Sequence, residues 1–362
     1  MAGTARGRRR APKRRGRSRA LVLVMVSAVL VAGTGAAIGY ASHLFAKHQG
    51  TEKAAAPEVK AAVPSGSASV PAPAGSSGGT GGTGGTGGTG GTGGTGSATA
   101  SAPTSPRPVV KATGPGTVTT LNVTSADSDL TSRPVVVYRP AVPDATVLPV
   151  VYLLHGVPGE PDRMMEAVKD TLDQAFTTGG QAPFEVAAPT GGGSAHSDTE
   201  WADAADGKDL VETYLIKNVL SAVEGPTPRP ASMRAIVGFS MGGYGAANLA
   251  LRHPDLFGQF ASLAGYFHVD DPAGMFGSDS RLQAANTPDD LVQQASGKRV
   301  LLLEDQDETD SLIQGEASEF AQRLHACACG VDLNWHLEPG GHTYDFVTAS
   351  FPKVIEFLDQ GF

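Results

Sequence analysis

The stretch GFSMGGYGAANLALRHPDLFG, residues 238–258, decides the fold. It joins the apolar segment MRAIVGF (233–239), typical of a buried strand, to the Ala- and Leu-rich segment 245–253, typical of a helix. Glycines beside Ser240 allow a backbone turn too tight for side chains. Residues 238–242 fit G-x-S-x-G, which between a strand and a helix presents a nucleophilic serine. A plain glycine-rich turn with a capping serine is the alternative.

Around this turn, strand-like and helix-like segments alternate, which predicts a mostly parallel sheet with helices on both faces. The last predicted strand alternates apolar and polar residues, as a more exposed edge strand does. We expect strands at 116–124, 133–140, 148–156, 184–189, 233–239, 257–267, 298–304 and 331–339, and helices at 161–176, 207–225, 245–253, 315–328 and 342–362. This α/β domain spans residues 113–362, enough to bury one full core.

The N-terminal part of the chain has a different composition. Residues 1–19 form a basic tail, and the first twenty residues carry nine Arg or Lys and no acid. The remaining chain has 19 basic against 36 acidic residues, so we expect no nucleic-acid partner. Read alone, the arginine run also fits a nucleic-acid-binding arm.

Residues 20–42 carry no charge, and as a helix they would span about 34 Å, enough to cross a membrane. Their basic flank predicts a cytoplasmic N-terminus and a domain outside the cytoplasm. The apolar run is longer than a usual signal core, which favours an uncleaved anchor. A cleaved signal peptide, giving a secreted protein, is the alternative.

Residues 43–112 read as a disordered linker rich in Gly, Thr, Pro and Ala. It contains six GGT repeats at 78–95. Such a composition has almost nothing to bury and cannot offset the entropy lost on ordering. We therefore expect a tether between the membrane and the folded domain.

A serine nucleophile needs a base and an orienting carboxylate. His342 lies in EPGGHTYDF, on a loop after the last predicted strand, where Gly340 and Gly341 permit a turn back over the sheet. The acidic partner should lie at the end of an earlier strand. The segment KRVLLLEDQDETDSL offers five carboxylates, those of Glu304, Asp305, Asp307, Glu308 and Asp310. Asp307 is best placed just beyond the strand, and Asp310 is the second choice.

Two backbone amides are expected to stabilise the oxyanion. The amide of Met241 opens the helix after Ser240, and the amide of Val157 follows the strand 148–156. His155 reads as a residue that shapes this loop rather than as a base. A histidine in a solvated loop is the alternative reading for His342.

Nothing in the sequence calls for a metal or another cofactor. The two cysteines, Cys327 and Cys329, are one residue apart. They could oxidise to a small ring, bind metal weakly or stay reduced. A zinc site would need two further ligands at suitable spacing, and the sequence offers none.

The segments YLLHGVPG, AIVGFSMGGYGAANLALRHPDLFG and PGGHTYDF resemble the esterase family of the esterase D and antigen 85 type. The resemblance covers about residues 115–360 and implies an α/β-hydrolase fold, with Ser240 as nucleophile, His342 as base and Met241 and Val157 as oxyanion donors. Members act on acyl esters, and the antigen 85 branch transfers mycolic acyl groups. The S-M-G-G motif is closer to the broad esterase branch.

In this family the region matching 191–209 helps line the substrate cleft. Trp201 and Glu200 are therefore candidates for contact with an alcohol or sugar, and a solvated loop with one packed tryptophan is the alternative. The sequence thus predicts a membrane-anchored, extracytoplasmic serine esterase acting on a small-molecule or lipid acyl ester. A mycolyltransferase-like acyltransferase of the cell envelope and a non-catalytic envelope protein with this fold are the alternatives.

Overall fold

A computed structural model describes residues 110–125, 128–269, 271 and 273–362. The predicted basic tail, membrane anchor and nearly all of the predicted linker lie outside these residues, so their boundaries stay predictions. In the described part of the chain, no helix is long and apolar enough to cross a membrane.

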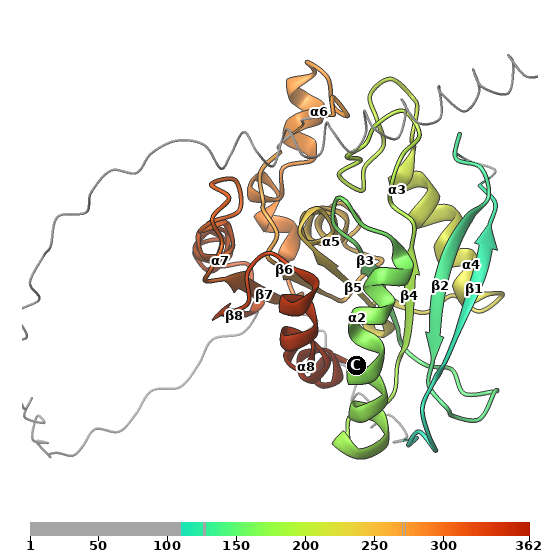
Figure 1. Cartoon of the computed structure of the whole chain (residues 1–362). Coiled ribbons are helices and arrows are strands. Elements are labelled where there is room, and N and C mark those ends of the chain that lie inside the picture. The colour runs from blue at the N-terminus through green and yellow to red at the C-terminus, as the bar shows by residue number, and fades with distance from the viewer. Residues whose placement is uncertain (1–109, 126–127, 270, 272) are drawn as a thin grey trace, which may run out of the picture. The chain divides into compact units, whose positions relative to one another are not determined.

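An eight-stranded sheet forms the centre of the domain, in the order β1-β2-β4-β3-β5-β6-β7-β8 (Figure 1). The pairs β1–β2 and β2–β4 are antiparallel, and all other neighbours are parallel. The strands are β1 (Thr117–Val123), β2 (Arg133–Arg139), β3 (Val150–Leu154), β4 (Glu185–Pro189), β5 (Arg234–Phe239), β6 (Gln259–Leu263), β7 (Arg299–Asp305) and β8 (Asp332–Glu338). The predicted α/β architecture is confirmed for this part of the chain.

The helices pack on both faces of the sheet (Figure 1). The helices are α2 (Pro161–Gln174), α3 (Val211–Thr213), α4 (Leu220–Glu224), α5 (Met241–Arg252), α6 (Ser280–Ala285), α7 (Glu316–Ala326) and α8 (Tyr344–Gly361). One core contains residues of α2 and α8, and the other contains residues of α3, α4, α5 and α7. In β3, Tyr152 and Leu154 enter the second core while Val151 and Leu153 enter the first, as a strand covered on both sides requires.

Two predicted helices differ in detail from the structure. The segment predicted as one helix over 207–225 begins at Val211 and contains a π-helical stretch, Tyr214–Val219, between α3 and α4. The helix predicted at 245–253 begins earlier, at Met241, because its glycines lie within the helix and not before it. That earlier start brings the first turn of α5 directly after Ser240.

Strand β8 lies at the edge of the sheet, as its alternating sequence predicts. Trp335 and Leu337 on this strand are among the exposed large apolar side chains.

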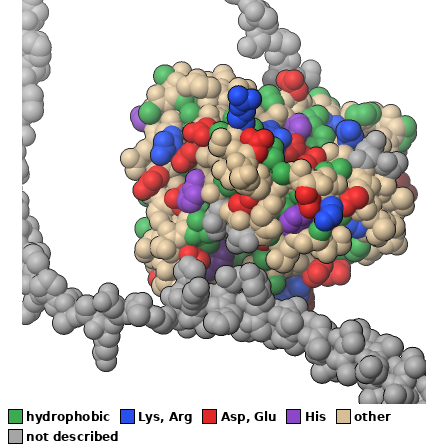
Figure 2. Space-filling view, turned by 90° about the horizontal axis from the view of Figure 1, so that it is seen from above, with side chains coloured by type: hydrophobic (Ala, Val, Ile, Leu, Met, Phe, Trp, Pro, Cys, Tyr) green, Lys and Arg blue, Asp and Glu red, His purple; other side chains and the backbone are tan. Residues whose placement is uncertain are grey.

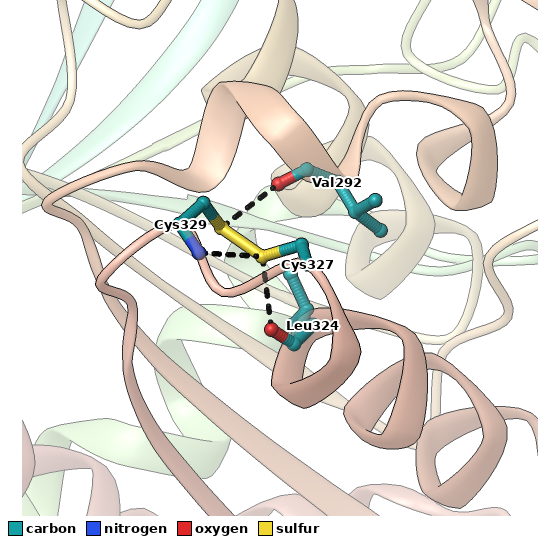
Figure 3. The surroundings of a disulfide bond; sticks show 4 residues. All are labelled: Val292, Leu324, Cys327 and Cys329. Carbon is teal, nitrogen blue, oxygen red and sulfur yellow. Dashed lines mark hydrogen bonds between the residues drawn. A yellow bond between two sulfur atoms is a disulfide. The ribbon is translucent and has the colours of Figure 1, made fainter.

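Just before β8, Cys327 and Cys329 form a disulfide (Figure 3). The cysteines are therefore oxidised to a small ring, the first of the three states that the sequence leaves open. Sγ of Cys329 also lies 3.5 Å from the carbonyl oxygen of Val292.

Candidate active site

Ser240 occupies a sharp turn between β5 and α5. Its backbone has φ 58° and ψ −123°, a left-handed conformation that a non-glycine residue rarely adopts. Its amide donates to the carbonyl of Leu263 at 3.0 Å, which ties the turn to β6. A side chain on Gly238 would collide with the backbone of Gly242, and one on Gly242 would collide with the backbone of Leu154. The two glycines are therefore required by the close approach of the strands and the helix.

His342 reaches Ser240 from a loop between β8 and α8. Its Nε2 lies 2.8 Å from Oγ of Ser240, although the two residues are 102 positions apart in the chain. The imidazole packs against the ring of Phe239, with 4.7 Å between the ring centres. The structure therefore brings together the serine and the histidine that the sequence singles out.

The carboxylate that faces His342 belongs to Glu308, and not to Asp307 or Asp310. Oε2 of Glu308 lies 2.7 Å from Nδ1 of His342. Asp307 is exposed and points to the amide of Gly340 instead, at 3.2 Å. Asp310 accepts from the amide of Leu312 within its own turn. The prediction of Asp307 is corrected because the loop after β7 turns Glu308 inward, where its longer side chain reaches the ring.

Glu308 is held in its ionised form. Its other oxygen, Oε1, accepts from the amides of Thr309 and Asp310 at 2.9 and 2.8 Å. Burial on its own raises the pKa of this carboxyl, but the His342 imidazole and the two amides outweigh burial and lower the pKa below its ordinary value. The group beside His342 is thus a carboxylate, suited to orient the ring and to stabilise it once it takes up a proton.

The two predicted oxyanion donors, Met241 and Val157, each adjoin a residue that contacts or precedes the turn at Ser240. Met241 is the first residue of α5, a helix of 12 residues whose amino end carries partial positive charge. The loop that follows β3 lies against the serine. A Cβ on Gly156 would be 2.9 Å from Cβ of Ser240, and Val157 is the next residue. Within the described residues, neither the Met241 nor the Val157 amide donates to another group of the chain.

Trp201 and Glu200, the predicted substrate contacts, are buried instead. The indole of Trp201 is 0 % exposed, and Glu200 is 1 % exposed with a carboxylate that accepts from the hydroxyl of Tyr266. Their side chains are packed inside the protein, behind the site, and do not lie on its surface.

The face at the carboxyl ends of the parallel strands, seen from above in Figure 2, carries acidic side chains scattered among uncharged atoms. Across the residues that the structure describes, no group of three or more His, Cys, Asp or Glu side chains is arranged to hold a metal ion.

A family model described as "Putative esterase" matches residues 130–349. No curated protein matches the chain. Among solved structures, a ferulic acid esterase is 22 % identical with a TM-score of 0.58, covering 68 % of this chain and 98 % of its own. The fluorophosphonate-binding serine hydrolase FphF of Staphylococcus aureus is 20 % identical with a TM-score of 0.56, covering 68 % and 99 %. MPT51 of Mycobacterium tuberculosis is 20 % identical with a TM-score of 0.52, covering 67 % and 98 %. At these identities the likeness to solved structures establishes the fold.

Proposed function

The chain belongs to the "Putative esterase" family and is a serine hydrolase of the carboxylic ester class, and from that premise we propose that it cleaves acyl esters through Ser240, His342 and Glu308. The observation that carries this proposal is the continuous contact of the three side chains, with 2.8 Å from Ser240 to His342 and 2.7 Å from His342 to Glu308. A hydroxyl, an imidazole and a carboxylate in this order make up a nucleophile, its base and the group that orients the base.

In the first half of the reaction, Oγ of Ser240 attacks the carbonyl carbon of the ester while its proton passes to Nε2 of His342. The imidazolium formed is stabilised by Glu308. The carbonyl oxygen becomes an oxyanion and accepts hydrogen bonds from the amides of Met241 and Val157. When the tetrahedral intermediate collapses, the C–O bond to the alcohol breaks and His342 protonates the departing alkoxide. An acyl group remains on Ser240.

In the second half, a water molecule gives a proton to His342 and its oxygen attacks the acyl carbon. The intermediate collapses to a carboxylic acid, and the proton returns from His342 to Oγ of Ser240. The substrate class is thus an acyl ester, small or lipid, and the reaction needs no cofactor.

Acyl transfer to an alcohol is the second candidate. Ser240 is 9 % exposed, and an alcohol bound against the acyl-enzyme would displace water from it and accept the acyl group instead. Hydrolysis and transfer share every step up to the acyl-enzyme. They are separated by analysing products with and without a sugar alcohol acceptor such as trehalose.

We place the catalytic domain outside the cytoplasm, held by the apolar segment 20–42. The Cys327–Cys329 disulfide supports this location, because disulfides persist in oxidising compartments. Protease digestion of intact cells tests it. We expect loss of the domain on digestion from outside, and protection of the domain would contradict the location.

The test of the activity uses the full chain in detergent with a fluorophosphonate probe and p-nitrophenyl esters of rising chain length. We expect the wild type to be labelled and active, and Ser240→Ala to lose both. Ser318→Ala, which removes a serine hydroxyl from α7, is the matched control and should behave as the wild type. An unlabelled wild type would favour the non-catalytic alternative.

A further inference from the structure

We propose that His155 and Trp201 are positioning residues that hold the loop after β3 so that the Val157 amide faces the oxyanion. This inference rests on the proposed function and deepens it. Neither residue touches the reacting atoms in this account, because both are buried behind the loop, at 1 % and 0 % exposure.

The imidazole of His155 is fixed at both nitrogens. Nε2 accepts from the amide of Gly191 at 2.9 Å. Because a backbone amide can only donate, Nε2 carries no proton, and the ring proton lies on Nδ1. Nδ1 then donates to the carbonyl of Gly156, 2.8 Å away. The ring therefore connects two loops, one after β3 and one after β4.

His155 is neutral in this role. Burial lowers the pKa of its imidazole to about 4, the Gly156 carbonyl opposes that shift and the charge of Arg133 adds to it. A second proton would also have no acceptor at Nε2, which faces the Gly191 amide. His155 is thus a fixed link between the two loops and not an alternative base for Ser240.

Trp201 is hydrogen-bonded to the backbone of the same loop. Its Nε1 donates to the carbonyl of His155 at 3.1 Å, and its ring meets the imidazole edge to face with 5.1 Å between centres. The indole fills the space beside Gly191 and Gly245, where any side chain would collide with it. A planar group wedged between two glycines leaves the His155 carbonyl little freedom to move.

The backbone at Trp201 is itself strained. Glu200 and Trp201 both have φ 52°, in the left-handed region that side chains disfavour. Such conformations are unfavourable and persist where the surrounding structure fixes them. The packing around Glu200 and Trp201 therefore holds this backbone in place.

The effect on catalysis follows from the short path between these residues and the nucleophile. Gly156 lies against Ser240, so close that a Cβ at this position would be 3.4 Å from Oγ. Any shift of the loop therefore changes the position of the Val157 amide relative to Ser240. Because a hydrogen bond to an oxyanion weakens steeply with distance and angle, loosening the loop costs the transition state more stabilisation than it costs the bound substrate.

Trp201→Phe tests the inference, since phenylalanine keeps an aromatic ring but cannot donate to His155. Trp335→Phe is the matched control, because it removes an indole hydrogen bond from Trp335, on the edge strand β8, to Glu304 on β7. The full chain is titrated with a fluorophosphonate to count active sites. Ester hydrolysis then gives kcat and KM, and inhibition by an alkyl boronic acid reports on the tetrahedral adduct. Formation of that adduct joins the Ser240 oxygen to boron and passes the serine proton to His342.

We expect Trp201→Phe to keep its KM and its titrated fraction of active sites, and to lose about tenfold in kcat. This loss is smaller than the roughly hundredfold or greater loss on removing a donor outright. Affinity for the boronic acid should fall by the same factor, which a merely structural role would not produce. Equal kcat and boronic acid affinity in Trp201→Phe and the wild type would overturn the inference.

A second pair of variants keeps the inference testable if Trp201→Phe fails to fold. His155→Gln retains an oxygen that can accept from Gly191, whereas His155→Leu retains only bulk. We expect the leucine variant to lose more kcat and boronic acid affinity than the glutamine variant. If the wild type is labelled, equal kcat and equal boronic acid affinity in the two His155 variants would overturn this inference but leave the proposed function standing. An unlabelled wild type would overturn the proposed function together with it.

Discussion

Asp305, the last residue of β7, accepts a hydrogen bond at 3.1 Å from the amide of Gly341, the residue before His342. Asp307 accepts from Gly340, and Glu308 faces His342 itself. Three carboxylates at the end of β7 and just after it thus contact three consecutive residues, 340–342, of the loop that precedes α8. The acidic run after β7 therefore fixes the loop that carries the histidine.

Glu308→Gln should be the most damaging substitution in this acidic loop. It keeps the size of the side chain and removes the charge that stabilises the imidazolium. By analogy with other triads we expect a loss in kcat of about 10⁴-fold. Asp307→Asn, its neighbouring control, should change kcat by less than about tenfold, because Asp307 contacts only a backbone amide. Steady-state ester hydrolysis measures both, and a larger effect at Asp307 or Asp310 would show that another acid completes the triad.

Asp209 should make stability depend on acid pH. Its carboxylate is 0 % exposed and accepts from the amides of Ser194, Ala195 and His196. Burial on its own raises the pKa of Asp209, but these amides outweigh burial and lower it to about 2, from an ordinary 3.8. The stabilisation is therefore fully present above pH 3.8 and is lost as the pH falls through 2.

Asp209→Asn should lower the free energy of unfolding by about 2 kcal/mol at neutral pH and flatten its acid dependence. Urea unfolding at several pH values measures this. Asp170→Asn, at an exposed position of α2, is the control and should unfold as the wild type does. An unchanged pH profile in Asp209→Asn would show that the loop is fixed by other contacts.

Gly238→Ala should disrupt the turn at Ser240. The added methyl group would meet the carbonyl of Gly242, so either β5 or the first turn of α5 has to move. We expect a loss of several kcal/mol in stability, on the order of other overpacked cores, and loss of fluorophosphonate labelling. Gly114→Ala adds the same methyl group where nothing lies within 4 Å and should be neutral. Normal labelling of a folded Gly238→Ala protein would mean that the turn tolerates the side chain.

Replacing both Cys327 and Cys329 with serine should affect stability slightly and activity hardly at all. A ring closed over so few residues restricts the unfolded chain little, and about 1–2 kcal/mol is expected from chain entropy. The disulfide precedes the first residue of β8, whereas His342 follows the last, so the two lie at opposite ends of that strand. Thermal unfolding and ester hydrolysis of the double variant check both statements. A large loss of kcat would connect the disulfide to the site.

The sequence predicts the elements of this fold well, since each rests on a local pattern. The turn at Ser240 is the clearest case, because glycine spacing and the change from strand to helix appear within a few residues. His342 could be predicted because its glycine-rich loop follows the last strand. These signals are local in the chain even though the contact they form is not.

The acid at position 308 could not be predicted in the same way. Which of several neighbouring carboxylates turns inward depends on how the loop after β7 meets residues 340 and 341, a tertiary contact with no local signature. Trp201 illustrates the same limit. The sequence predicts this residue beside the substrate, but Gly191 at the start of its own segment and Gly245 in α5 leave a space that takes the indole into the core.

The distance in sequence between Ser240 and His342 has a consequence for biosynthesis. Ser240 emerges from the ribosome 102 residues before His342, and α8, which packs with α2 over one face of the sheet, follows His342. A nascent or truncated chain that stops short of residue 342 therefore carries an unactivated hydroxyl. The proposed ester cleavage therefore begins only after the last segment of the chain has been made and has folded onto the sheet.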